Sequence, residues 1–202
     1  MKKFVTILSA AVMLCIGTSA FAQSGLGIGF LNVSQLSRVS ENSDPVSVGF
    51  NGFYIGLGHT AALAYGLTFT PGVYYEFLTS TDELAGIKTE INEHYVSVPL
   101  DLGIGFDVAS FRLGFYAGPT VRVGIASNSK VNLPGGPTKT NRYGDGFDYS
   151  RLDLLVGGGV FFDLNNGIRL NAGFDCGLLD RDGSDLVSVR NNRLSIGAAY
   201  LF

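Results

Sequence analysis

The chain contains no tryptophan, few charged side chains (15%) and only two cysteines among its 202 residues. Cys15 lies in an N-terminal apolar stretch, so Cys176 is the single cysteine of the remaining chain and no intrachain disulfide is expected there. Beyond the first 22 residues no apolar run approaches the ~20 residues that a membrane-spanning helix needs. What the chain does have is 46% hydrophobic residues and 28 glycines.

The N-terminus has the layout of a secretory signal peptide. Lys2 and Lys3 precede an apolar run over residues 4–16, and Ala20 and Ala22 complete a small-x-small cleavage pattern. A helical membrane anchor is the alternative, but the run is short for a bilayer and no stop-transfer charges follow it. The sequence therefore predicts a signal peptide over residues 1–22, cleaved after Ala22.

The expected exported part, residues 23–202, is a single domain by its length. Removing Lys2 and Lys3 leaves 12 basic against 17 acidic residues, a net charge of −5. This acidic balance argues against a nucleic-acid partner. A hydrophobic exported chain without a membrane helix has one other way to cross a bilayer, which is a closed β-barrel.

Eight segments alternate apolar with polar or small side chains at the two-residue period of β-strands. In the clearest of them, apolar side chains occupy every even position from Val96 to Phe106. In the second segment the phase slips by one residue at Asn51-Gly52, which predicts a β-bulge. The segments cover residues 25–34, 46–60, 64–78, 92–107, 111–125, 151–164, 168–179 and 193–202.

The connections between these segments alternate between short turns and longer loops, the latter at 35–45, 79–91, 126–150 and 180–190. Short turns on one side and long loops on the other are typical of outer-membrane barrels. We therefore predict an all-β fold, an eight-stranded antiparallel up-and-down transmembrane β-barrel in the cell outer membrane, with both termini on the periplasmic side.

A soluble eight-stranded barrel of the lipocalin type is the rival architecture. Its polar face would point outward and should be rich in Lys, Glu, Ser and Thr. Here the less apolar face is dominated by glycine with isolated charges, which suits the crowded interior of a small barrel. The pattern favours the membrane barrel.

The last segment resembles the closing strand of an outer-membrane barrel, because it has one apolar face and ends on an aromatic residue. We expect this face to act as the insertion signal that the barrel-assembly machinery recognises, with outer-membrane lipid and lipopolysaccharide as its surroundings. The face consists of Leu194, Ile196, Ala198, Tyr200 and Phe202.

Strand parity directs a set of charged side chains into the lumen. The set mixes both signs at every height, and unpaired charges in a narrow lumen would be costly, so we expect pairing, above all between Asp107 and Arg112 and between Asp163 and Arg169. Eight strands leave an interior just wide enough for side chains, which predicts a charge-plugged lumen in place of an open pore. The set consists of Glu76, Asp101, Asp107, Arg112, Arg122, Arg151, Asp153, Asp163, Arg169, Asp175 and Arg193.

No catalytic, cofactor or metal site is expected. Some small barrels modify lipid A with a His, a Ser and an acid, but His94 and Ser97 stand three residues apart on one strand and so face opposite ways. His59 lies near a periplasmic turn, away from the outer leaflet. Residues 180–185 resemble part of a calcium loop but lack the glycine spacing and distal glutamate of an EF-hand.

Several motifs resemble the small outer-membrane β-barrel domain of Bacteroidetes, the porin-family or PorT-like barrels. They are Tyr95–Leu100 with its proline, Gly103–Phe106, Phe115–Pro119, Gly157–Val160 and the terminal Phe202. The resemblance covers the whole exported part and implies the barrel architecture, with roles in secretion or at the cell surface in some members. It implies no active site.

We therefore expect a structural or surface-interaction protein that is not an enzyme and binds no cofactor. Its long loops would form the contact surface, with a possible protein partner at residues 126–150. A narrow transporter or an accessory barrel of a secretion complex is the first alternative, and a lipid A-modifying enzyme is the second.

Overall fold

The computed structural model describes residues 22–38, 44, 46–63, 65–84, 86–133, 136–144, 149–182 and 187–202. Ala22 opens the first strand, and the rest of the expected signal peptide, including Ala20, lies outside the described residues. No helix in the described ranges is both long and apolar enough to cross a membrane. The strands are β1 (Ala22–Arg38), β2 (Val46–Ala62), β3 (Leu67–Leu84), β4 (Ile87–Val108), β5 (Phe111–Leu133), β6 (Gly136–Asn141), β7 (Leu152–Leu164), β8 (Ile168–Gly177) and β9 (Ser188–Leu201).

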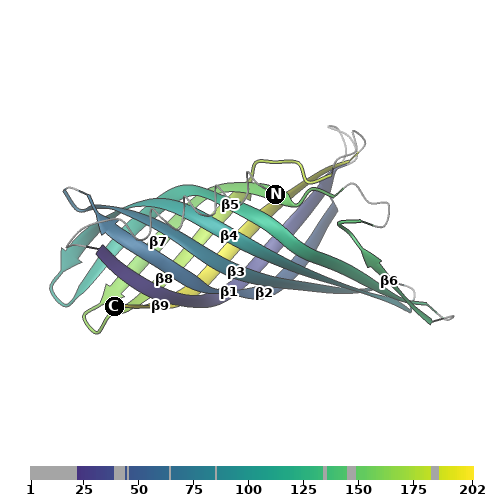
Figure 1. The fold of residues 1–202 in the computed structure, drawn as a ribbon, viewed down its shortest axis with the longest axis horizontal. Coiled ribbons are helices and arrows are strands. Elements are labelled where there is room, and N and C mark those ends of the chain that lie inside the picture. The colour runs from purple at the N-terminus through teal and green to yellow at the C-terminus, as the bar shows by residue number, and fades with distance from the viewer. Residues whose placement is uncertain are drawn as a thin grey trace.

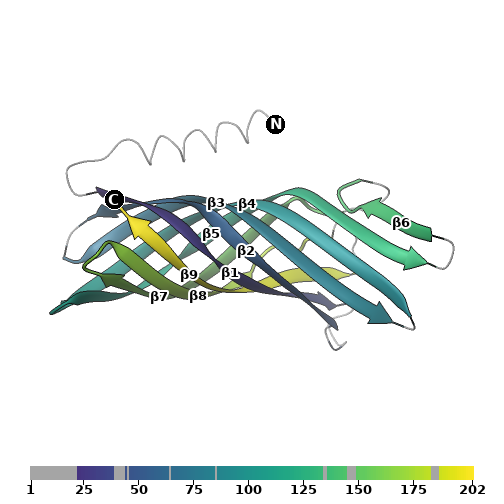
Figure 2. The same ribbon diagram turned by 90° about the horizontal axis from the view of Figure 1, so that it is seen from below.

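Eight of these strands close into a ring of antiparallel pairs, seen from two sides in Figures 1 and 2. β1 pairs with both β2 and β9, and β4 pairs with β5, so the order β1-β2-β3-β4-β5-β7-β8-β9 returns to its start. Among the described strands β6 pairs with β5 alone, and it lies outside the ring. The predicted eight-stranded antiparallel barrel is confirmed, and β6 is an additional strand that the sequence did not predict.

The two ends of the barrel differ in how the strands are joined. At the short-turn end, β2 joins β3 near Tyr65, β4 joins β5 at Ala109, and β7 joins β8 near Gly167, all with positive φ values (53°, 45° and 80°). The opposite end, which we call the long-loop end, holds the remaining connections. The alternation of short and long connections agrees with the sequence prediction, but two of the predicted loops are wrong.

Residues 79–84, 87–91 and much of 126–150 form strands. β3 and β4 continue to Leu84 and from Ile87, and β5 runs to Leu133 before β6 turns back along it. With 22 and 23 residues, β4 and β5 are about twice as long as the 10-residue β8. The four strand ends form a sheet, here called the projecting sheet, that extends beyond the ring in Figure 1 (β3 from Thr79, β4 to Glu93, β5 from Ser127, and β6). Its sequence gave no apolar alternation because the sheet leaves the bilayer.

The phase slip at Asn51-Gly52 is not a bulge. The β1–β2 ladder passes through Asn51 and Gly52 without a register shift. Instead, the apolar residues change sides. Phe53 is 45% exposed on the outer face, whereas Phe50 is 1% exposed on the inner face.

The neighbouring strand β1 changes sides at the same height. Phe30, which pairs with Phe53, is 51% exposed, and the next residue, Leu31, is 1% exposed. Above this level the outer face is polar, since Asn32 donates a side-chain hydrogen bond of 2.9 Å to Asn51 across the strands. The level therefore marks where the apolar outer band ends toward the long-loop end.

A register shift does occur elsewhere in the sheet. His94 pairs with Ala126 while Tyr95 pairs with Gly124, which leaves Ile125 as an extra residue in β5. The bulge lies where β4 and β5 leave the ring for the projecting sheet.

The outer surface below the side change is an apolar band that runs around the ring, as a lipid-facing barrel requires. Its exposed members include Leu26, Ile28, Phe30, Phe53, Ile55, Leu57, Tyr75, Leu102, Ile104, Phe106, Phe115, Val156, Val160, Leu170, Phe174, Leu194, Ile196 and Tyr200.

Inside the ring, large side chains fill the space left by glycines. Tyr54 lies over Gly29 and Gly197, where a Cβ atom would collide with its ring or hydroxyl. The hydroxyl of Tyr116 lies in the same way over Gly159 and Gly173. The glycine-rich inner face therefore exists because bulky neighbours need that room.

Candidate functional site: a closed lumen with a cavity beneath it

A fully buried ion network crosses the middle of the barrel. Arg122 on β5 lies between two carboxylates, with Nη2 2.8 Å from Glu76 of β3 and Nη1 3.2 Å from Asp153 of β7. All three side chains are at most 1% exposed. Arg122 reaches both because β5 stands beside β7 in the ring while Glu76 projects from two strands away.

Arg193 on β9 extends this network to the other side of the lumen. Its guanidinium lies 2.5 Å from Glu76 and 2.8 Å from Asp175 of β8. Glu76 thus joins the two arginines. We call Glu76, Arg122, Asp153, Asp175 and Arg193 the charged plug, because together they bridge the interior from wall to wall.

Polar and apolar side chains continue the filling toward the long-loop end. Asn191 donates to Asp153 at 2.9 Å and accepts from Gln35 at 3.2 Å. Beside them lies a buried apolar cluster that includes Leu31, Val33 and Phe50. These last residues face inward because their strands have passed the level at which the apolar side changes.

A second charged group closes the long-loop end, and we call it the cap: Glu93, Tyr95, Arg142, Tyr149 and Arg181. Arg142 lies 2.8 Å from Glu93, and Tyr95 donates a short hydrogen bond to the same carboxylate. Arg181 is fully buried, donates to Tyr95 and lies over the rings of Tyr95 and Tyr149.

The cap has electrostatics of its own. Burial alone would lower the pKa of Arg181, but the neighbouring Tyr95, Tyr149 and Glu93 raise it well above the ordinary arginine value. Burial raises the pKa of Tyr149, so its hydroxyl stays neutral. The cap is therefore a cationic group held in place by one carboxylate and aromatic rings.

The sequence analysis missed these cap residues for different reasons. Glu93 lies within the predicted fourth segment, 92–107, and has the parity of Tyr95, so strand parity could have assigned it to the lumen. Arg142 and Arg181 lie outside the regular strands, in segments that fold inward over the opening. Strand alternation carries no signal for them.

At the short-turn end the two expected pairs differ. Arg169 binds Asp163 through two hydrogen bonds, of 2.6 and 2.9 Å, inside the barrel. Arg112 lies 3.9 Å from Asp107, whose side chain is 91% exposed, so this pair belongs to the rim.

Arg151 is not in the lumen. It was assigned there by parity, but it precedes β7 and is exposed at the long-loop rim, where its guanidinium lies over the ring of Tyr143. It donates to the carbonyl oxygens of Gly124 and Ile125. Arg151 lies one residue before β7, where the alternation of a strand no longer determines which way a side chain points.

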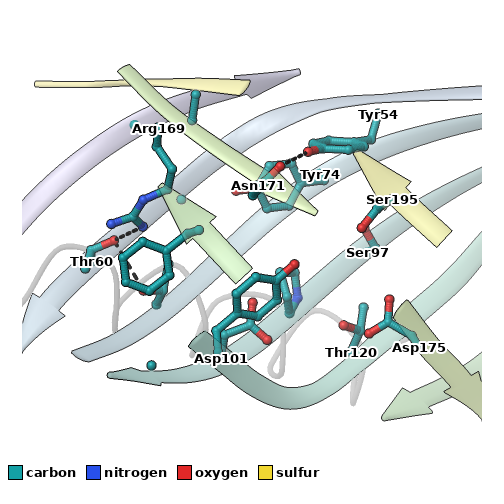
Figure 3. Close-up of a pocket in the computed structure, with 18 of the residues that line it drawn as sticks. Tyr54, Thr60, Tyr74, Ser97, Asp101, Thr120, Arg169, Asn171, Asp175 and Ser195 are labelled. Carbon is teal, nitrogen blue, oxygen red and sulfur yellow. Dashed lines mark hydrogen bonds between the residues drawn. The ribbon is translucent and has the colours of Figure 1, made fainter. Parts of the chain in front are cut away.

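Between the charged plug and the short-turn end lies a cavity of about 120 Å³ (Figure 3). Asp101 and Asp175 lie toward one side of the pocket in this view, away from Tyr54 and Asn171. Tyr54 donates a hydrogen bond of 3.1 Å to Asn171. Asp101 also lines the cavity, and it is the one expected lumen charge without an ion pair or hydrogen bond to another described residue.

Both histidines lie on the outer face of the barrel wall. His94 accepts or donates a 2.6 Å hydrogen bond with Tyr75 there, whereas Ser97 and Glu93 are buried on the inner face. Near the short-turn end, the ring nitrogen Nδ1 of His59 and the hydroxyl of Ser24 form a hydrogen bond of 3.1 Å. The two residues are paired across β1 and β2. The described residues place no carboxylate against either histidine.

The calcium-like segment is described only from Asp180 to Asp182. The carboxylate of Asp180 accepts hydrogen bonds from the backbone N–H groups of Asp182 and Val189, so it serves as a turn acceptor. Burial would raise the pKa of Asp180, but these hydrogen bonds, together with Ser188, hold it below the ordinary value. In the described part of the chain no three His, Cys, Asp or Glu residues converge as a metal site.

The C-terminal strand presents its expected face outward. Leu194, Ile196, Tyr200 and Phe202 are exposed on the apolar band, and Ala198 lies between them. β9 also closes the ring by pairing with β1.

The family of the chain follows from this architecture and from sequence comparison. A closed antiparallel ring with an apolar outer band and a polar interior defines an outer-membrane β-barrel. The chain belongs to the family described as outer membrane protein beta-barrel domain, whose model matches residues 8–202. It is accordingly an outer-membrane protein.

Two solved structures share the fold. Neisserial surface protein A (NspA) is 17% identical, with a TM-score of 0.53, and the match covers 88% of this chain and 97% of that one. The attachment invasion locus protein Ail of Yersinia pestis, in complex with the heparin analogue sucrose octasulfate, is 14% identical, with a TM-score of 0.51 and coverage of 91% and 100%. No curated protein matches the chain in sequence.

Proposed function

We propose that this protein is a non-conducting outer-membrane barrel that acts through its projecting sheet as a surface-interaction module. The observation that carries the proposal is the contrast between a lumen closed by the charged plug and the cap, and a sheet that extends beyond the ring. A barrel that is filled with paired side chains offers no route for a solute, whereas the sheet offers exposed area. The long-loop end would face the cell exterior, following the usual arrangement of long loops in such barrels.

The projecting sheet is built to remain a surface and to avoid self-assembly. Its free edge, β6, carries Pro137 and Lys139, two residues that discourage pairing with another strand. Its outer face carries Lys88 and Glu90, which form a 2.7 Å ion pair, together with Lys130. Recognition would therefore use side chains on the sheet and not the β6 edge.

Several finer expectations belong to the same proposal. Export would use the signal peptide, insertion would use the apolar face of β9, and lipopolysaccharide would contact the outer band. The narrower affiliation with the porin-like barrels of Bacteroidetes rests on the motif resemblance. An enzymatic role is not proposed, because His94 and Ser97 lie on opposite faces of β4.

Site-specific photocrosslinking in intact cells tests the proposal. A photoreactive residue placed at Lys130 or Lys139, on the projecting sheet, should give a discrete adduct with a protein or glycan. The same residue at Tyr65, which is exposed at the short-turn end, is the matched control and should not give that adduct. Absence of adducts from both sheet positions in a correctly folded barrel would contradict the surface role.

The first alternative, a narrow transporter, has one observation in its favour, the cavity below the plug. A transporter would need this cavity to connect with the exterior. The charged plug and the cap both stand in that path, so the alternative requires that they move apart.

A further inference from the structure

The cavity contains polar groups that no protein partner satisfies. Among the described residues, Asp101 and the hydroxyls of Tyr74 and Tyr116 have no hydrogen-bond partner, and all three side chains are partly exposed to the cavity. All three line the same cavity. Convergent polar groups around a partly apolar cavity are the usual sign of a ligand site.

Strand register brings a second carboxylate toward Asp101. Gly118 of β5 lies beside Asp101 of β4. Gly118 pairs with Gly157 of β7, and Gly157 pairs with Asp175 of β8. Two glycines therefore separate the two acids around the wall.

Both carboxylates have an oxygen close to the space above Gly118 and Gly157. A Cβ atom on Gly118 would stand 2.9 Å from Oδ1 of Asp101, and one on Gly157 would collide with Oδ1 of Asp175. Asp175 uses its other oxygen, Oδ2, to bind Arg193. One oxygen of each acid is thus directed over the glycines.

The acidic side chains around the cavity outnumber the arginines. Among the described inner-face side chains, the plug, the cavity and the Asp163–Arg169 pair hold five acids against three arginines, and the cap adds one acid and two arginines. The Asp107–Arg112 pair stands apart at the rim, where Asp107 is 91% exposed and the guanidinium of Arg112 lies over Gly105. The acids around the cavity and the plug therefore outnumber the arginines, and an uncompensated charge in a low-dielectric interior is costly.

We propose that the cavity is a binding site for one small monovalent cation, an alkali ion or a primary ammonium group, held between Asp101 and Asp175. The cavity has room for this class of ligand, because its volume of about 120 Å³ exceeds the ~10–15 Å³ that one water-sized group needs. The carboxylate oxygens and the phenol oxygens of Tyr74 and Tyr116 all accept hydrogen bonds from an ammonium or coordinate an alkali ion. The cavity wall includes Gly25 and Leu201 of the short-turn end, so the cation would enter from that side.

Nuclear magnetic resonance of the refolded, micelle-embedded protein tests this site. Methylammonium chloride and sodium chloride are titrated at constant ionic strength against the chloride of N-methylglucamine, a cation with a bulky polyol chain. The backbone amides of Gly118 and Gly157 report on the space above these glycines. The site predicts a saturable shift of both amides with methylammonium, with sodium, or with both, and the two salts distinguish an ammonium site from an alkali site.

Two variants make the test specific. Asp101→Asn keeps the size of the side chain and should abolish the saturable shift, while Asp107→Asn, which alters an exposed acid at the same end, should retain it. An equal response to N-methylglucamine, an unchanged response in Asp101→Asn, or no saturable shift in the wild-type protein would overturn the proposal. A carboxyl carbon signal showing Asp101 protonated at neutral pH would also overturn it, because a proton would then supply the missing charge.

Discussion

The two halves of this barrel follow opposite rules. Toward the short-turn end, apolar side chains such as Ile28 and Ile55 point outward, and the interior is polar with a cavity. Toward the long-loop end, Leu31 and Phe50 point inward and form a core, while Asn32 and Asn51 face outward. β1 and β2 cross both halves with an unbroken register, so the environment, and not the backbone, sets which of their faces is apolar.

The change of sides between the halves also explains how the lumen is closed. The interior of the half nearer the short-turn end is not filled by apolar side chains, because the large apolar residues of its strands face the lipid. The charged plug stands near the boundary between the halves, where paired arginines and carboxylates replace a hydrophobic core. Above it, the interior packs like a soluble barrel.

The largest effect is expected from breaking the charged plug. Arg122→Ala leaves Glu76 and Asp153 buried without their shared cation, and removing one partner of a buried ion network costs about 3–5 kcal/mol of unfolding free energy. Denaturant unfolding in phospholipid vesicles, followed by far-ultraviolet circular dichroism, measures this change. Arg112→Ala, in the 3.9 Å rim pair, is the control and should cost no more than ~1 kcal/mol. Equal costs for the two variants would contradict the role of the plug.

The next effect distinguishes the two faces of a single strand. Phe50→Ala should cost about 3 kcal/mol because it opens a cavity in the inner core. Phe53→Ala, three residues away on the outer band, should cost clearly less, since lipid can fill the vacated space. The same unfolding measurement applies. A larger loss of unfolding free energy for Phe53→Ala than for Phe50→Ala would contradict the assignment of Phe53 to the outer face and Phe50 to the inner core.

A smaller effect should locate the boundary on the outer surface. Ile28→Arg puts a charge within the apolar band and should cost about 2–4 kcal/mol, as for charges on the lipid face of other barrels near the bilayer midplane. Ser34→Arg, six residues further along the same face of β1, should cost ~0–1 kcal/mol because it lies above the band. Similar penalties at both positions would place the boundary beyond Ser34.

Sequence reasoning reached the ring because alternation is strong where one face meets lipid. The even positions from Val96 to Phe106 define β4, and the Asp163–Arg169 pair could be expected from its position across a short turn. At Asn51-Gly52 the same reasoning gave a bulge, because a phase slip in the pattern looks identical whether the chain or its environment changes.

The remaining differences have physical causes as well. Residues 79–84 and 127–133 gave no strand signal, since a sheet with water on both sides needs no apolar face. Arg142 and Arg181 enter the cap from outside the regular strands, and no periodicity governs such segments. Glu76 pairs with both Arg122 and Arg193 only because the ring closes. These partners are separated from Glu76 by 46 and 117 positions in the sequence.

The measurement that tests the central claim most directly is single-channel recording of the refolded protein in a planar bilayer, with heat-modifiability on a gel to establish folding. The charged plug and the cap predict a folded barrel that passes no steady current. They also predict that Arg122→Ala, if it folds, raises the frequency of brief openings. Steady open-channel current through the wild-type protein would contradict a closed lumen and would make Asp101, Arg122 and Asp153 residues of a conducting path.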